Sequence, residues 1–500
     1  MSDDGKSYRQ ILRSSSIMGG AQALNYLIAL VRVKVVAMLL GPSGVGLVSI
    51  YASAMGLLAT VSGLGISSSA VREVVQAYSK EDAQQAARTV QILRRACWAT
   101  GVLGWLLAIA LAKPVSQWMM GTPEHAWAIA VLGATLLIGA VSGGQLALLQ
   151  GLRRIGDLAR ANVLGVLLST VVAIGLYAWL GKDGVVPVML ASAVVSLGFS
   201  YWFARKVPVV PVAVSWSETV TGTRRLAGLG VAFMWSGVLT AGIDMLTRSI
   251  ITRELGLHAA GIYQAAWGLS GLFAGFVLSS MGADFYPRLT ACIHDKELAV
   301  RTVNEQTEIG ILLALPGLLA TLAFAPLMME FFYTKQFLPG AELLPWMVLG
   351  VFGRVLSFPM GFIQLAMGAS RWFIATETIF IGIQAALVFW LVPMCGLVGA
   401  AYAFALTYCL YLTGMLWVGR ILIGFRWSKN VLKMMILTAS LVGAGLALSL
   451  LWPGGGGMLA GAAITLAGLV LSMRGLISRL GSDNKWVEKI RAIPGGRWLF

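Results

Sequence analysis

The sequence has few charged residues, few cysteines and few histidines, and each shortage excludes a class of protein. Only 12% of its 500 residues are charged, whereas 58% are hydrophobic, and the mean hydropathy is +0.81. Soluble domains carry about twice that share of charge, so the composition indicates an integral membrane protein with many spans. The 4 cysteines and 3 histidines are scattered without the spacing of a metal or redox site, and we expect no bound metal.

Motifs for hydrolysis and catalysis are missing as well. The sequence contains no Gly-x-x-x-x-Gly-Lys-Ser/Thr phosphate loop, so we expect no ATP hydrolysis by this chain. It has no His-Glu-x-x-His motif and no segment long enough to hold a soluble nucleotide-sugar domain. We therefore expect a transporter and not an enzyme.

Apolar runs long enough to cross a bilayer occur fourteen times, which predicts an all-α membrane protein of about fourteen transmembrane helices. The predicted spans are 14–40, 45–70, 91–112, 126–150, 158–180, 184–204, 226–252, 259–286, 306–329, 341–368, 372–393, 395–419, 431–452 and 456–477.

The net charge of +16 is explained by membrane topology better than by nucleic-acid binding. With the N-terminus in the cytoplasm, 29 of the 37 Lys and Arg lie in cytoplasmic segments or at the adjoining span ends. Only 4 lie in outer loops and 4 lie inside spans. Because basic residues stay on the cytoplasmic side, we expect both termini there.

The two halves of the sequence resemble each other, so we expect two six-helix lobes related by a pseudo-two-fold axis along the membrane normal. Superposing Gly41 on Gly256 also superposes Gly46 on Gly261. The predicted regions are an N-terminal lobe (1–204), a cytoplasmic linker (205–225), a C-terminal lobe (226–419), two further spans (420–478) and a basic cytoplasmic tail (479–500).

Basic residues inside the spans are the candidates for an anion site, since a charge there usually faces protein or water. Arg32 and Lys34 lie in the first span, two residues and about 200° apart on a regular helix. Arg32 shares a polar stripe with Asn25, whereas the stripe of Lys34 is apolar. Which of the two faces the central cavity stays open, and a bend in the helix would let both reach it.

Later spans add basic and acidic candidates. Arg248 lies four residues after Asp244, so the two can pair along one helix, either to neutralise each other or within a binding site. Arg354 shares a face of small and polar residues with Gln364, which is typical of a cavity wall. Glu377 is a candidate for local pairing or for ion coupling.

Four segments of the sequence are distinctive. They are 34–46 (KVVAMLLGPSGVG), 255–263 with Leu-Gly and Ala-Gly-Ile-Tyr at its two ends, 284–290 (DFYPRLT) and 304–310 (NEQTEIG). These segments resemble the O-antigen and polysaccharide repeat-unit flippases of the multidrug/oligosaccharidyl-lipid/polysaccharide exporter superfamily. The likeness covers essentially the whole chain, and 284–310 is its most distinctive stretch.

The resemblance implies two lobes around a cationic lumen, working by alternating access. The implied substrate is an oligosaccharide on undecaprenyl pyrophosphate, flipped from the inner to the outer leaflet of a bacterial inner membrane. No cofactor is expected, apart from coupling to a proton or sodium in some members. The expected partners are the lipid-linked substrate, membrane lipids, a polysaccharide polymerase and a chain-length regulator, with no nucleic acid, and a monomer suffices.

Two other functions compete with this one. A multidrug or cation exporter of the same fold would need acids to hold a cation, but bases outnumber acids within the spans. A membrane polysaccharide polymerase or ligase would need a large outer loop to hold its acceptor, and every predicted outer loop is short.

Cysteine labelling tests the predicted topology. A cysteine placed at Ser482 should stay unlabelled by a membrane-impermeant thiol reagent in intact cells and react once the cells are opened. Labelling in intact cells would place the C-terminus outside and overturn the orientation.

Overall fold

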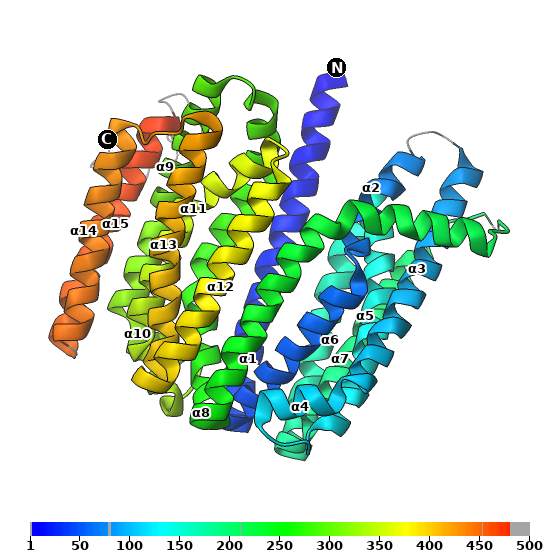
Figure 1. Cartoon of the computed structure of the whole chain (residues 1–500), viewed down its shortest axis with the longest axis horizontal. Helices are drawn as coiled ribbons and strands as arrows, with labels where there is room; N and C mark the ends of the chain where they lie inside the picture. Colours follow the sequence, from blue (N-terminus) through cyan, green and yellow to red (C-terminus); the bar gives the residue numbers. More distant parts are fainter. Residues whose placement is uncertain (1–2, 79–81, 211, 453, 481–500) are drawn as a thin grey trace. The chain divides into compact units, whose positions relative to one another are not determined.

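The computed structural model describes residues 3–78, 82–210, 212–452 and 454–480, and these residues form helices joined by turns and loops, without a strand (Figure 1). The predicted all-α fold is therefore confirmed. The chain divides into two compact units, Met1–Gly261 and Ile262–Phe500, which are described separately.

The first unit contains seven α-helices, one short 3-10 helix and most of a long eighth α-helix. These are α1 (Asp3–Gly63), α2 (Ile66–Tyr78), α3 (Ala83–Ala110), α4 (Ala112–Met120), α5 (Ala126–Gly151), α6 (Ile155–Leu180), η1 (Gly181–Gly184), α7 (Val185–Ala204) and α8 (Trp216–Cys292), which continues into the second unit. The remaining helices of the second unit are α9 (Lys296–Ala323), α10 (Ala325–Phe332), η2 (Lys335–Glu342), α11 (Leu344–Ala366), α12 (Ser370–Cys395), α13 (Leu397–Ile423), α14 (Lys429–Leu451) and α15 (Gly455–Leu480).

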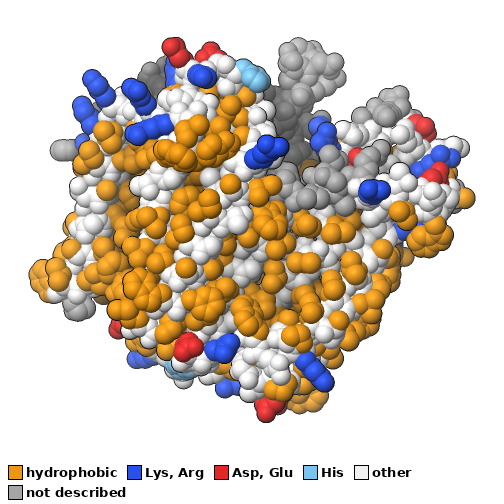
Figure 2. Space-filling view, viewed as in Figure 1, with side chains coloured by type: hydrophobic (Ala, Val, Ile, Leu, Met, Phe, Trp, Pro, Cys, Tyr) orange, Lys and Arg blue, Asp and Glu red, His pale blue; other side chains and the backbone are white. Residues whose placement is uncertain are grey.

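Ten helical stretches among the described residues are long and apolar enough to cross a membrane. Two of them, Gly19–Gly63 with 45 residues and Ile155–Ala204 with 50 residues, are each long enough for two crossings of about 20 residues. The total of fourteen spans stays a prediction. On the face shown in Figure 2, hydrophobic side chains cover the middle of the helices and Lys and Arg gather near their ends, as a lipid-facing surface requires.

The two units repeat one order of helices. In each, a capped helix of 28 residues, α3 or α9, is followed by a short helix and then by three long ones. The caps are Asp82 and Asp295, 213 residues apart, and each carboxylate accepts hydrogen bonds from the backbone N–H groups two and three residues later. The same local chemistry therefore starts corresponding helices in both halves.

A second correspondence lies at the bends of α1 and α8. The backbone leaves the helical conformation at Gly41, with φ 63°, and at Gly256, with φ 85°. Residues with a Cβ are strained at such φ values, so glycine allows both bends. The two positions are those superposed in the sequence, which supports the predicted internal repeat.

The segments after these bends cross closely within the first unit. A Cβ on Gly46 would collide with the backbone oxygen of Leu257, and a Cβ on Gly261 would collide with that of Pro42. The two contacts correspond to each other. Pro42 directly follows the bend at Gly41, and Leu257 directly follows the bend at Gly256. The absence of side chains at Gly46 and Gly261 thus lets the two backbones touch.

The first part of α8 packs on the first unit. Met245 and Leu257 join a hydrophobic cluster that contains Tyr51 of α1, and Gly237 lies against Thr60. The first compact unit therefore ends at Gly261, which lies beyond the linker predicted at 205–225. Helix α8 begins at Trp216, inside that predicted linker. The boundary between the sequence repeats stays a prediction, and the predicted tail lies outside the described residues from 481 onward.

Substituting Gly46 with alanine tests the close crossing. The added methyl group would meet a backbone carbonyl, which cannot move aside as a flexible side chain can, so we expect Gly46→Ala to destabilise the protein by about 1–3 kcal/mol. Thermal unfolding of the detergent-solubilised protein measures this loss. Gly56→Ala is the matched control, because nothing lies within 4 Å of a Cβ at Gly56. Equal melting temperatures for the two variants would contradict the crossing.

Candidate functional site

Arg32 lies in the electrostatic neighbourhood of Tyr177, a tyrosine that the sequence did not single out. Helices α1 and α6 pack along each other, and the guanidinium of Arg32 is near enough for its charge to act on the Tyr177 hydroxyl. Tyr177 is buried in the hydrophobic cluster of the first unit, while Arg32 is half-buried. None of the ion pairs among the described residues involves Arg32, so its positive charge has no carboxylate partner there.

Lys34 stays on a different side of α1 from Arg32. The helix is regular through both residues, and its bend comes only at Gly41, seven residues beyond Lys34. The bend that would bring the two bases together is therefore absent from residues 32 to 34. Lys34 is half-buried and has an interaction of its own.

Asn25 carries an unsatisfied polar atom on the stripe that leads to Arg32. Its Oδ1 atom is shielded from solvent and finds no hydrogen-bond partner among the residues that the structure describes. Buried polar atoms are nearly always hydrogen-bonded, so an orphaned one requires an explanation. An amide oxygen accepts hydrogen bonds from hydroxyl or N–H groups, which a sugar could supply.

Arg248 forms the ion pair with Asp244 that the spacing predicts. Its Nη1 atom donates to the backbone oxygen of Asp244 at 3.0 Å and lies 3.4 Å from the carboxylate Oδ1. The side chain of Arg248 is 8% exposed, whereas that of Asp244 is 41% exposed. A buried guanidinium held by a carboxylate has much of its charge neutralised, which favours the pairing alternative over direct binding.

Arg354 in the second unit remains exposed and lies against aromatic rings. Its Cζ atom is 6.0 Å from the centroid of Tyr408, at the limit of a cation–π contact. Three residues after Tyr408, the hydroxyl of Tyr411 donates to the Oε1 of Glu377 at 3.3 Å. Helix α13 thus connects a base on α11 with an acid on α12. The sequence missed both tyrosines, although a spacing of three places them on one helical face.

Gln364 has a structural role in this unit. Its side chain is 1% exposed, its Oε1 accepts from Thr376 at 3.1 Å, and its Nε2 donates to the sulfur of Met415 at 3.6 Å. Two further positions on this face of α11 also pack against protein in this structure, because Gly350 lies against Phe404 and Ser357 is buried. The small residues there allow α11 and α13 to pack closely, a use of glycine common between membrane helices.

The predicted site residues fall into two groups, those whose side chains are already paired or packed and those whose charge is available. Arg248 is paired with a carboxylate, and Gln364 is buried against neighbouring helices. Arg32 in the first unit and Arg354 in the second take part in none of the ion pairs of the described residues. Guanidinium groups match phosphate oxygens with forked hydrogen bonds. Among the predicted site residues, Arg32 and Arg354 are therefore the arginines available to an anion. The described residues contain no cluster of His, Cys, Asp or Glu that could hold a metal.

Sequence comparisons identify the family and relatives of this chain. The profile of a family described as polysaccharide biosynthesis protein matches residues 35–342. The chain is 21% identical over 385 residues to the lipid III flippase of Escherichia coli strain K12, which covers 76% of this chain and 90% of that protein. It is 24% identical over 328 residues to the succinoglycan biosynthesis transport protein ExoT of Rhizobium meliloti, covering 64% and 61%.

Solved structures show the same fold. The lipid II flippase MurJ in an inward closed conformation matches with a TM-score of 0.69 at 13% identity, covering 94% of this chain and 99% of that one. An inward-facing multidrug resistance MATE transporter matches with a TM-score of 0.65 at 16% identity, covering 82% and 96%. The helices are therefore arranged as in MurJ-like and MATE-like transporters.

Replacing one or both members of the Arg248–Asp244 pair tests whether the pair is structural. We expect Arg248→Ala to lower protein yield, because it leaves the Asp244 carboxylate alone in the span, whereas Arg248→Ala with Asp244→Ala should restore yield and transport. Membrane protein level and polysaccharide display are the measurements. Normal protein level without display in both the single and the double variant would instead place Arg248 in the substrate site.

Proposed function

This chain belongs to the polysaccharide biosynthesis protein family, a family of membrane transporters and not of enzymes, and from that membership we propose its substrate and direction. The substrate is an oligosaccharide repeat unit, of the O-antigen kind, on undecaprenyl pyrophosphate. The protein moves it from the inner to the outer leaflet of the bacterial inner membrane. The relatives named as flippases and the MurJ-like fold support this proposal.

The observation that carries the proposal is the pair of available arginines. A pyrophosphate head group carries about two negative charges and loses hydration as it enters the membrane. Arg32 and Arg354 each offer a fork of N–H donors without a competing carboxylate among the described ion pairs. One arginine from each unit binding the same head group would offset part of that desolvation cost.

Binding by both units also gives a physical reason for movement. A ligand shifts an equilibrium only as far as it binds one state better than the other. The head group favours conformations in which both arginines reach it, and its release favours the others. This is alternating access driven by the substrate's own charge.

Other predicted residues take supporting roles. Asn25 offers its unsatisfied Oδ1 to a sugar hydroxyl. Glu377, held by Tyr411, is the carboxylate at which a coupling proton or sodium ion would act. Export of a cationic drug would need unpaired acids, whereas Asp244 is paired with Arg248.

Flipping of a fluorescent lipid-linked oligosaccharide in proteoliposomes tests the proposal. We expect Arg32→Ala and Arg354→Ala each to weaken substrate binding roughly tenfold to a hundredfold, as the loss of charge-assisted hydrogen bonds implies. Lysine at either position should restore binding only in part, because lysine lacks the fork. The double variant should lose less than the two single losses combined, since the arginines share one head group.

The matched control is Arg420→Ala, which removes an exposed base from the end of α13. It should flip the substrate at the wild-type rate. Strictly additive losses for Arg32 and Arg354 would mean that they do not bind the same head group. Wild-type flipping by both single variants would remove the arginines from the mechanism.

A further inference from the structure

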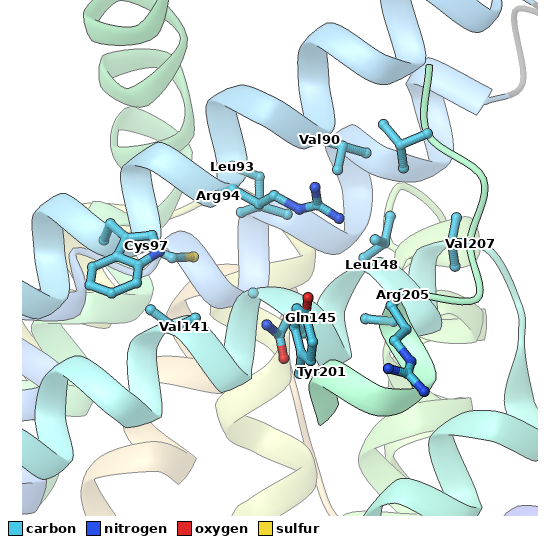
Figure 3. A pocket seen from close by; sticks show the side chains of 14 residues that line it. Val90, Leu93, Arg94, Cys97, Val141, Gln145, Leu148, Tyr201, Arg205 and Val207 are labelled. Carbon is cyan, nitrogen blue, oxygen red and sulfur yellow. The ribbon is translucent and has the colours of Figure 1, made fainter. Parts of the chain in front are cut away.

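A pocket of about 420 Å³ opens between α3, α5 and α7 in the first unit (Figure 3). It contains none of the residues proposed for transport. It lies at the basic end of this helix group, where α5 is followed by Arg153 and Arg154 and α7 by Arg205 and Lys206. The distribution of charge predicts that this end faces the cytoplasm.

Two arginines give the pocket its charge. Arg94 comes from α3, and Arg205 directly follows α7. The pocket has fourteen lining residues, all of them described by the structure, and none is acidic. The ion pairs of the described residues include neither arginine, so both charges are available to an anion.

Both arginines lie near aromatic residues, and an aromatic ring positions Arg205 without neutralising it. The Cζ of Arg205 lies 4.0 Å from the centroid of the Trp202 ring, a close cation–π contact. Arg94 is near Tyr78 at the end of α2, where burial raises the pKa of the Tyr78 hydroxyl and the charge of Arg94 partly lowers it. Stacking of this kind leaves the outer N–H groups of a guanidinium free for phosphate oxygens.

Two neutral polar groups complete the lining. The Oε1 of Gln145 accepts a hydrogen bond from Ser200 at 2.7 Å, and Ser200 in turn accepts one from Ser142 at 3.0 Å. The NH₂ group of Gln145 is the donor that this pocket-lining side chain can offer to a ligand. Figure 3 shows the Tyr201 hydroxyl on the same side of the pocket as Gln145, with Arg94 on the opposite side.

The mouth of the pocket has the character of a membrane interface. Trp98 and Tyr201, which line it, are 55% and 59% exposed, although both are large and mostly apolar. Trp and Tyr gather where the hydrocarbon layer meets the head groups, and basic pockets between helices on the cytoplasmic side bind anionic lipid head groups. Charge and surroundings therefore indicate an amphiphile with a phosphate.

We propose that this pocket binds one anionic phospholipid of the surrounding leaflet, with its phosphate at Arg94. Arg205, whose guanidinium is turned away from Arg94 in Figure 3, lies at the rim beside the head group. Gln145 and Tyr201 donate hydrogen bonds to its polar backbone, and the apolar lining on α3 and α5, such as Val141, contacts the start of an acyl chain.

A bound lipid would also link α3 to the segment between α7 and α8. Val207 and Val209 of that segment line the pocket. Farther along the segment, Val214 accepts a hydrogen bond from Arg95 at 2.8 Å, one residue after Arg94. The lipid therefore stabilises the approach to α8, and we expect anionic lipid to raise the melting temperature.

Native mass spectrometry of the delipidated full-length protein tests the site directly. Phosphatidylglycerol should form a one-to-one adduct more strongly than phosphatidylcholine, whose head group has no net charge. Arg94→Gln with Arg205→Gln should lower phosphatidylglycerol occupancy at least tenfold, given roughly fivefold for each base at a lipid surface. Arg94→Lys with Arg205→Lys should keep part of the binding and serves if the glutamine variant does not fold.

The charge-matched control is Arg72→Gln with Arg160→Gln, since both residues are exposed and lie outside the pocket. It should bind phosphatidylglycerol as the wild type does. Equal phosphatidylglycerol binding by the folded glutamine or lysine pocket variant and the wild type would overturn the proposal. Displacement of phosphatidylglycerol by inorganic phosphate would show that the pocket is a free-phosphate site. Stronger binding of undecaprenyl pyrophosphate at this pocket would assign the pocket to the transport substrate. Either result would also overturn the proposal.

Discussion

A positive charge inside a membrane must find compensation, and this requirement explains how the chain uses its intramembrane arginines. Insertion of an arginine costs about 2.5–3.5 kcal/mol even on mild scales, so each one needs a partner or a function. Arg248 is compensated within its own helix by Asp244. Arg32 and Arg354 lie near tyrosines and remain outside the described ion pairs, which makes them the groups that an anionic substrate would compensate. The substrate would then supply the missing negative charge, and the transport site and the stability of the helices would depend on the same interaction.

Glycine sets the geometry around these charges. The bends at Gly41 and Gly256 each come after a helical segment that carries intramembrane bases, and both need a positive φ. The reciprocal contact at Gly46 and Gly261 then brings two corresponding backbones together. The same helix caps and glycine bends occur in both halves of the chain, but the two halves differ in how the charges of their arginines are compensated. Of the intramembrane arginines, Arg248 is neutralised, whereas Arg32 and Arg354 remain available.

Much of the fold could be predicted from sequence because it follows from local chemistry. Span composition, the aspartate caps and the repeated glycines each depend on a few neighbouring residues, and the Asp244–Arg248 pair follows from helical spacing alone. The role of Gln364 could not be predicted, because whether a polar face lines a cavity or packs on another helix depends on the tertiary partner, here Thr376 and Met415. The tyrosines near Arg32 and Arg354 were missed for the same reason, since they come from other helices. The pocket between α3, α5 and α7 likewise needs three segments that are distant in sequence.

The central claim is that fixed arginines recognise a pyrophosphate and not the sugar or the lipid tail. The most direct measurement compares the affinity of the purified protein for one oligosaccharide carried on undecaprenyl pyrophosphate, on undecaprenyl monophosphate and on the uncharged undecaprenol. Compensation of the arginines predicts affinity that falls at each step, by about 1.5–3 kcal/mol for each charge-assisted hydrogen bond lost. Equal affinities for the charged and the uncharged lipid would contradict it.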